Sequence, residues 1–211
     1  MRTRNNIVHN ILIFIFSFLY LATLNIPVSA TSFAIKYPAS EVSGIGPCPY
    51  NLRVIDNHIY AGGHPLNPGT NFGNTDEQTL TILNFLKSKN IKTVIDLENT
   101  QYIQKRYESL LSQAGLKRLH IPMSATKVPN KKEWKEIKSG LGKPAYIHCM
   151  WGADRTGAII GRYLVESKGY SPNDAFLAVV KGGSHAGPLG GLKTGLGYGR
   201  LKDFILYGPK D

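Results

Sequence analysis

Cysteine is scarce in this chain, and so are long apolar runs. The 211 residues include only two cysteines, Cys48 and Cys149, so the chain can form at most one internal disulfide bond. The clearest apolar run covers residues 11–24, about 14 residues, whereas a membrane-spanning helix needs about 20. We also find no internal repeat. These absences favour a single folded domain without a stable membrane span.

Acidic residues are absent from the first thirty positions. Arg2 and Arg4 precede the apolar run, and Val28-Ser29-Ala30 supplies small residues at a cleavage position. This pattern predicts a signal peptide over residues 1–30, cleavage near Ala30, and a secreted or periplasmic mature protein. An uncleaved membrane anchor is the alternative.

Acidic residues are also few in the chain as a whole. There are 25 Lys and Arg against 14 Asp and Glu, a formal net charge of +11. Removal of Arg2 and Arg4 with the signal peptide leaves 23 basic against 14 acidic residues, a net charge of +9. This excess favours an anionic substrate or surface. Nucleic acid is not expected, because no recognised binding module is present. The oligomeric state is not predicted.

Part of the positive charge gathers before the second cysteine, at Lys127, Lys131, Lys132, Lys135, Lys138 and Lys143. If Lys127, Lys131 and Lys132 lie beside a phosphate site, they could bind further phosphates of an inositol polyphosphate or phosphoinositide. A solvated helix face is the alternative interpretation.

Strand and helix patterns alternate after residue 50. Strands are predicted over residues 91–97, 119–122 and 144–147, and helices over 75–88, 101–114, 130–141 and 156–168, with a further helix starting at Ser171-Pro172. The alternation predicts an α/β fold, with one domain over residues 31–211 and a central, mainly parallel sheet flanked by helices. Residues 182–199 include eight glycines and predict an irregular segment, either a rim near the site or a surface loop.

The most informative run is His148-Cys149-Met150-Trp151-Gly152-Ala153-Asp154-Arg155-Thr156-Gly157. It lies between a predicted buried strand and a predicted helix, an arrangement that points backbone N–H groups and a helix N-terminus at one anion. Arg155 can grip two phosphate oxygens with its planar fork. The same positive environment favours the thiolate form of Cys149, which can attack phosphorus.

Four further residues of the run support this cradle. Gly152 permits a backbone approach that a Cβ would obstruct, and Gly157 lets the helix begin close under the loop. Thr156 can donate a hydroxyl hydrogen bond to the sulfur. His148 is expected to orient the loop rather than to act as a base. A buried structural cysteine at a helix start would explain a lone cysteine, but not six residue types at fixed spacing.

The run resembles the signature of the cysteine-dependent tyrosine and dual-specificity phosphatase superfamily: His-Cys, five residues, then Arg-Ser or Arg-Thr. It is most similar to that of secreted bacterial members of the dual-specificity group. The resemblance implies a dual-specificity phosphatase-like fold, a phosphocysteine intermediate on Cys149, phosphate binding by Arg155 and the loop amides of residues 150–155, and no metal or other cofactor. It extends over about residues 50–180 and is strong only in this loop.

Two upstream segments carry the weaker part of the resemblance. Ile91-Lys92-Thr93-Val94-Ile95-Asp96-Leu97 matches the strand after the family's first helix. Ile59-Tyr60-Ala61-Gly62-Gly63-His64-Pro65 lies where such proteins often have Tyr-Arg-Ser-x-x-Pro, with Ala61-Gly62 in place of Arg-Ser.

The main departure from the family concerns the general acid, usually an aspartate on a loop before the cysteine strand. No aspartate lies between Asp96 and Asp154. Asp154 is the first candidate, as in the myotubularin-like branch, where an aspartate before the arginine is the proposed acid; Glu133 and Asp96 are the others. Each has a structural alternative: Asp154 could hold Arg155 or a loop amide, Glu133 fits a capping box with Asn130, and Asp96 could satisfy a turn.

These observations predict a phosphomonoester hydrolase that acts on phosphotyrosine, phosphoserine or phosphothreonine proteins or on other phosphate esters. The first alternative is an inositol polyphosphate or phosphoinositide phosphatase. A catalytically inactive phosphate-binding pseudophosphatase and a sulfurtransferase are alternatives of other classes. In an oxidising compartment, a bond between Cys48 and Cys149 would switch off the nucleophile reversibly; a free Cys48 is the other possibility.

Overall fold

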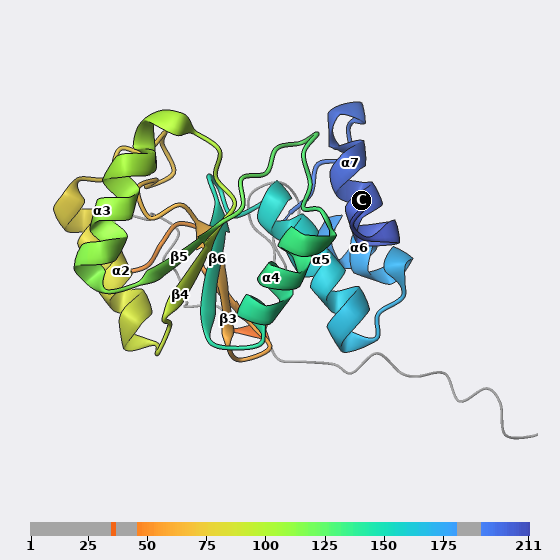
Figure 1. Ribbon diagram of the computed structural model, residues 1–211, viewed down its shortest axis with the longest axis horizontal. Helices are drawn as coiled ribbons and strands as arrows, with labels where there is room; N and C mark the ends of the chain where they lie inside the picture. The colour runs from red at the N-terminus through yellow and green to blue at the C-terminus, as the bar shows by residue number, and fades with distance from the viewer. Residues whose placement is uncertain (1–34, 37–45, 181–190) are drawn as a thin grey trace, which may run out of the picture. The chain divides into compact units, whose positions relative to one another are not determined.

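The computed structural model describes residues 35–36, 46–180 and 191–211 (Figure 1). The expected signal peptide and residues 182–190 of the glycine-rich segment lie outside the described residues. All described elements belong to one unit, residues 31–211.

A six-stranded sheet forms the centre of this unit. Its strand order is β1-β2-β3-β6-β4-β5. The bounds are β1 Ile35–Lys36, β2 Arg53–Ile55, β3 Ile59–Gly63, β4 Thr93–Asp96, β5 Lys117–His120 and β6 Ala145–Cys149. The four strands β3, β6, β4 and β5 run parallel, and β1 and β2 add antiparallel pairs at one edge. The predicted mainly parallel sheet is confirmed.

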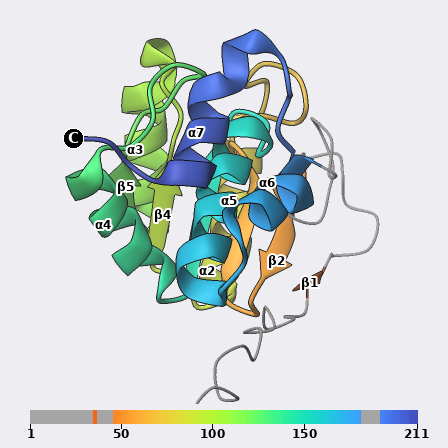
Figure 2. The same cartoon turned by 90° about the vertical axis from the view of Figure 1, so that its right-hand side faces the viewer.

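Helices cover both faces of the sheet. One face carries α2 (Asp76–Ser88), the short 3-10 helix η1 (Gln101–Ile103) and α3 (Gln104–Ala114). The other carries α4 (Lys131–Leu141), α5 (Asp154–Lys168), α6 (Pro172–Val180), the 3-10 helix η2 (Leu196–Tyr198) and α7 (Gly199–Tyr207) (Figure 2). Each layer has its own buried apolar cluster against the sheet. Every residue of β6 is buried, as expected for a central strand covered on both faces.

The helices predicted from residues 75 and 130 begin as expected. Thr75 and Gln78 form a capping box at the start of α2, and Asn130 and Glu133 form the expected one at the start of α4. The helix predicted from residue 156 begins two residues earlier, at Asp154. The first two ends could be predicted because each cap depends on side chains only three residues apart.

The strand β5 differs from its prediction, which placed it at residues 119–122. It begins at Lys117 and pairs with β4, Thr93 opposite Lys117 and Asp96 opposite His120. The charged Lys117 and Arg118 obscure this strand in the sequence, because an edge strand need not be apolar.

The sheet order brings three strand ends together. In β6, Cys149 is opposite Gly63 of β3, and His148 is opposite Asp96 of β4. Because these strands are parallel, the loops at their carboxyl ends meet around Cys149. Among the residues that the structure describes, no helix has the length and apolar character required to cross a membrane.

Candidate active site

The loop from Cys149 to Arg155 connects the central strand β6 to the helix α5. Cys149 is 2 % exposed at the end of the strand, and α5 begins at Asp154, directly after the turn. The predicted order of strand, tight loop and helix is therefore confirmed. Cys149 thus lies at the base of a loop that returns to an arginine six residues later.

Side chains from β2, from the turn before it and from the loop after β3 hold three consecutive carbonyl oxygens of this loop. The bonds run from Asn67 Nδ2 to Met150 O (2.7 Å), from Asn51 Nδ2 to Trp151 O (3.2 Å) and from Arg53 Nη2 to Gly152 O (2.7 Å). By contrast, the N–H groups of residues 152–155 donate to no acceptor within the described part of the chain. With its carbonyls held and these N–H groups unpaired, the loop is suited to bind an anion.

Gly152 makes this loop conformation possible. Its φ is +69°, and a Cβ there would lie closer to Gly62 and Gly63 of β3 than the 3.0 Å at which real Cβ atoms stop. The predicted need for glycine at residue 152 is confirmed, and the close neighbour is the backbone of β3. Arg53 of β2 is opposite Ala61, so an arginine lies beside the position where the family often carries one on β3.

Arg155 is held along one side of its guanidinium group. Nη1 donates to Leu97 O (3.2 Å), Met123 O (3.3 Å) and Asn99 Oδ1 (3.4 Å), and Nη2 lies 2.8 Å from Glu98 Oε2. Nε has no hydrogen-bond partner among the described residues. Nε–H and the second Nη2–H therefore remain as a fork that can bind two oxygens of one phosphate.

Glu98 was not predicted from the sequence, although it is the ion-pair partner of Arg155. It is 1 % exposed, and its second oxygen, Oε1, accepts from Asn99 N, Thr100 N and Thr100 Oγ1. Burial would lower the pKa of Arg155, but Cys149 and Glu98 outweigh it and hold that pKa above its ordinary value. The guanidinium therefore stays charged beside the nucleophile.

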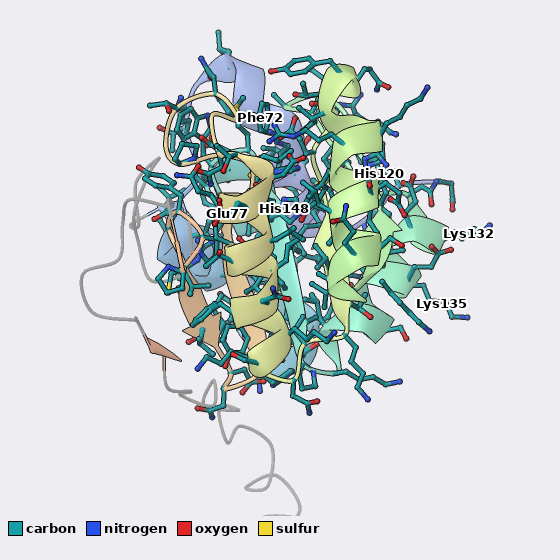
Figure 3. All side chains as sticks on the ribbon, turned by 90° about the vertical axis from the view of Figure 1, so that its left-hand side faces the viewer. Phe72, Glu77, His120, Lys132, Lys135 and His148 are labelled. Carbon is teal, nitrogen blue, oxygen red and sulfur yellow. The ribbon has the colours of Figure 1, made fainter. Side chains whose placement is uncertain are left out.

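His148 is buried behind the loop, in agreement with the expected orienting role. Figure 3 views the molecule from the side of α2 and α3 and shows His148 between them. Its Nε2 is 3.0 Å from Tyr107 Oη and 3.7 Å from Asp96 Oδ1. Burial lowers the pKa of His148, while Asp96 opposes the change. A neutral, fully buried imidazole is suited to positioning the strand end.

His64 packs against His148, with ring centroids 4.7 Å apart. Its Nδ1 accepts a hydrogen bond from Leu66 N (3.1 Å), so the neutral ring carries its proton on Nε2. Burial lowers the pKa of His64 well below its ordinary value, and His148 and Arg118 add to this effect. The ring is therefore held neutral by burial and by the hydrogen bond that it accepts.

Two buried histidines and an aspartate have the side-chain types of a metal site. The ligand atoms of His64, Asp96 and His148 lie within 4.8 Å of one another. Asp96, however, is paired with Arg118, and one nitrogen of His64 accepts the Leu66 amide. A cation would have to compete with a buried guanidinium, so these residues do not fit a metal well.

Thr156 and Gly157 differ from their predicted roles. Thr156 Oγ1 is fully buried and has no hydrogen-bond partner among the described residues, so the structure does not show the expected bond to the sulfur. A Cβ on Gly157 would lie 2.5 Å from Gly191 O and 2.9 Å from Val179 Cγ1. Glycine at residue 157 therefore makes room for the chain at Gly191 and for α6, rather than for the loop above it.

The structure gives two of the three candidate acids a structural role. Asp96 is 0 % exposed and is bound by Arg118 Nη2 at 2.5 Å and by the Glu98 amide at 2.8 Å. Glu133 Oε2 accepts from Asn130 N at 2.9 Å in the capping box of α4. Both carboxylates are used in the structural manner that was the alternative for each.

Asp154 is the first residue of α5 and is partly exposed. Its Oδ1 accepts a hydrogen bond from Lys193 N at 2.8 Å, whereas Oδ2 has no hydrogen-bond partner among the described residues. Asp154 does not pair with Arg155, which was one of its alternatives. It is thus a carboxylate of the loop itself with one oxygen available.

The three lysines proposed to bind substrate are separated by the structure. Lys127 lines a cavity of about 300 Å³ between the loop before α4 and the end of α7, together with Arg200 and Lys210. Lys131 pairs with Asp211 at 2.7 Å, with both side chains exposed. Lys132 points away from α4 into solvent, as does Lys135 (Figure 3). The solvated helix face is the better description of Lys131 and Lys132.

Cys48 and Cys149 are both buried, and no disulfide bond joins them in this structure. Of the two alternatives left open for Cys48, the structure shows the one without a bond to Cys149.

The residues missed by sequence reasoning are Asn51, Arg53, Asn67 and Glu98. Each acts on the cysteine loop from a distant part of the chain, and none belongs to a motif. One signal was available for Glu98: it is an acidic residue two positions after the end of a predicted parallel strand, where site residues gather.

Comparisons with known proteins agree with this geometry. The family described as "Tc-R-P: Polymorphic toxin system, DSP-PTPase phosphatase" matches residues 71–169. The tyrosine-protein phosphatase CDC14 of Saccharomyces cerevisiae is 30 % identical over 118 residues, 51 % of this chain and 20 % of that protein. The RNA/RNP complex-1-interacting phosphatase homolog of Caenorhabditis elegans is 32 % identical over 109 residues, 46 % of each chain. The chain therefore spans less than half the length of either relative.

Solved structures share the fold. TpbA of P. aeruginosa superposes with a TM-score of 0.52 at 18 % identity, covering 72 % of this chain and 83 % of that one. The core catalytic domain of the PP-IP phosphatase SIW14 of S. cerevisiae gives 0.51 at 20 % identity, covering 75 % and 85 %. In its His-Cys-x5-Arg-Thr loop, its family match and its fold, the chain is similar to the cysteine-dependent tyrosine and dual-specificity phosphatases.

Proposed function

We propose that this protein hydrolyses phosphomonoesters through a phosphocysteine intermediate on Cys149. The observation that carries the proposal is the cradle itself. Cys149 lies at the base of a loop whose residues 152–155 keep unpaired N–H groups, and Arg155 keeps an unpaired Nε–H beside Glu98. Such donors stabilise the equatorial oxygens of a phosphoryl group in transfer.

In the proposed reaction, the thiolate of Cys149 attacks phosphorus and the P–O bond to the leaving group breaks. The leaving oxygen takes a proton from an acid, and water then attacks the phosphocysteine and releases inorganic phosphate. We assign the proton to Asp154, because it belongs to the cysteine loop itself, whereas Asp96 and Glu98 are buried and paired with arginines and Glu133 caps α4. The free Oδ2 of Asp154 can carry that proton.

Two substrate classes are supported by different observations. A TpbA variant of similar fold was solved with pTyr, which supports a phosphotyrosine-containing or related phosphoprotein substrate. The likeness to SIW14, a PP-IP phosphatase, and the cavity lined by Lys127, Arg200 and Lys210 support an inositol phosphate with several phosphates. We place the phosphoprotein first, because the cavity also contains Asp203 and Asp211.

The test is phosphate release from an aryl phosphate, from phosphopeptides and from inositol phosphates under reducing conditions. Wild type should turn over at least one class, and Cys149→Ser should turn over none. Glu133→Gln should keep its activity, because Glu133 caps α4. Lack of turnover by reduced wild type on every substrate would reject the enzyme and leave the pseudophosphatase.

We also propose that the protein is exported, with cleavage near Ala30. The support comes from the sequence alone: Arg2 and Arg4, the apolar run and Val28-Ser29-Ala30. Expression of the full chain in a bacterium and N-terminal sequencing of the exported protein test this. A protein retained in the cytoplasm with Met1 in place would contradict it.

A further inference from the structure

The part of the glycine-rich segment that the structure describes is anchored on the first turn of α5 by three consecutive residues, Gly191, Leu192 and Lys193. Gly191 O packs against Gly157, at the position where a Cβ would be 2.5 Å away. Leu192 is 2 % exposed and belongs to the apolar cluster under α5, α6 and α7. Lys193 N then donates to Asp154 Oδ1 at 2.8 Å. The segment is thus fixed directly beside the cysteine loop.

The contact uses the backbone of Lys193 and not its side chain. The ammonium group of Lys193 is directed to the ring of Tyr198, 5.8 Å from the centroid. The residue type at 193 is therefore unimportant for the bond to Asp154, provided that the residue has an N–H group. Proline is the one residue type without it.

We propose that the main-chain amide of Lys193 is a positioning group for catalysis, because it fixes the carboxyl group of Asp154 for proton transfer. This inference rests on the proposed function and deepens it. One oxygen, Oδ1, is tied by the amide, so the rotation of the carboxyl group is restricted and the proton is carried by Oδ2. A proton donor held in one orientation transfers its proton without a search among rotamers.

Gly157 has a consistent explanation in this arrangement. Residue 157 faces Gly191 and Val179, and the space it leaves lets Gly191 approach α5 closely enough for Lys193 N to reach Asp154. The close packing of Gly157 against Gly191 therefore brings the Lys193 amide to Asp154. In this arrangement the segment from Gly191 positions the proposed acid in addition to packing against α5.

The test compares Lys193→Pro with the matched Lys193→Ala on an aryl phosphate, whose leaving group needs no acid, and on an alkyl phosphate, which does. General acid catalysis is typically worth about 10²- to 10⁴-fold. We expect Lys193→Pro to lose about 10- to 100-fold on the alkyl phosphate and less than about 3-fold on the aryl phosphate. Lys193→Ala should match wild type on both.

Inhibition by inorganic phosphate shows whether the phosphate-binding loop of Lys193→Pro is intact. If the proline variant fails to fold, Gly157→Ala, which displaces Gly191, tests the same contact. Asp154→Asn should show the same dependence on leaving group, and adding Lys193→Pro to it should cause no further loss. Equal losses on both substrates, or additive losses in the double variant, would overturn the positioning role. The proposed function would survive that result, because it fails only if reduced wild type turns over no substrate or if Cys149→Ser is as active as wild type.

Discussion

Glu98 Oε2 lies 2.8 Å from Arg155 Nη2, and both side chains are largely buried. Glu98 comes from the loop after β4 and Arg155 from the first turn of α5, so the pair joins two neighbouring strand ends across the site. The Glu98 carboxylate orients the Arg155 guanidinium and leaves Nε available for a phosphate oxygen. The order of the strands in the sheet therefore determines how Arg155 is presented to a phosphate.

We predict that Glu98→Gln lowers kcat/KM by about 10- to 100-fold. The glutamine keeps an oxygen that can accept from Asn99 and Thr100, but it lacks the negative charge that pairs with Arg155. Steady-state kinetics on an aryl phosphate measure this. Glu108→Gln is the matched control, since Glu108 also pairs with an arginine but is exposed. A Glu98→Gln enzyme as active as the control variant would show that the pair has no role in activity.

We predict that Gly152→Ala abolishes phosphate binding and activity. The new Cβ would clash with the backbone of β3, and φ at this residue is +69°. Gly197→Ala is the control, because no atom lies within 4 Å of a Cβ there. Isothermal titration with inorganic phosphate and thermal unfolding of both variants separate loss of the loop from loss of the fold. Wild-type phosphate affinity in Gly152→Ala would contradict the account of the loop.

Acid should destabilise the protein through its buried histidines. The pKa values of His64 and His148 are lowered in the folded state, so the unfolded chain binds more protons as the pH falls below about 6.5. The free energy of unfolding should therefore decrease as the pH falls from 7.0 to 5.5, with both residues contributing.

Urea unfolding of wild type and His64→Phe across this range measures the effect. The variant can differ in stability at every pH, so the slope against pH is the quantity to compare. It should be smaller in His64→Phe, because only His148 then resists protonation. Equal slopes would show that His64 does not resist protonation in the folded protein.

The sequence was sufficient for features that depend on near neighbours. The caps Thr75 with Gln78 and Asn130 with Glu133 involve side chains three residues apart, and the Cys149 loop is one continuous motif. The class of fold also followed from the alternation of strands and helices. These predictions needed no knowledge of which strands are adjacent.

Features that depend on the order of the strands could not be predicted. Glu98 reaches Arg155 because β4 lies beside β6, and Arg53 reaches Gly152 because β2 pairs with β3. The contact of Lys193 with Asp154 spans 39 residues. The role of Gly157 was misassigned for the same reason, since its neighbour Gly191 is distant in the sequence.

The most direct test of the central claim is to trap the phosphoenzyme. Wild type and Cys149→Ser are mixed with an aryl phosphate, quenched within the first turnover and analysed by mass spectrometry of the intact protein and its peptides. We predict that wild type gains one phosphoryl group on the peptide that contains Cys149 and that Cys149→Ser shows no phosphocysteine and no turnover. Phosphate release by wild type without any adduct on Cys149, together with an active Cys149→Ser, would contradict the account.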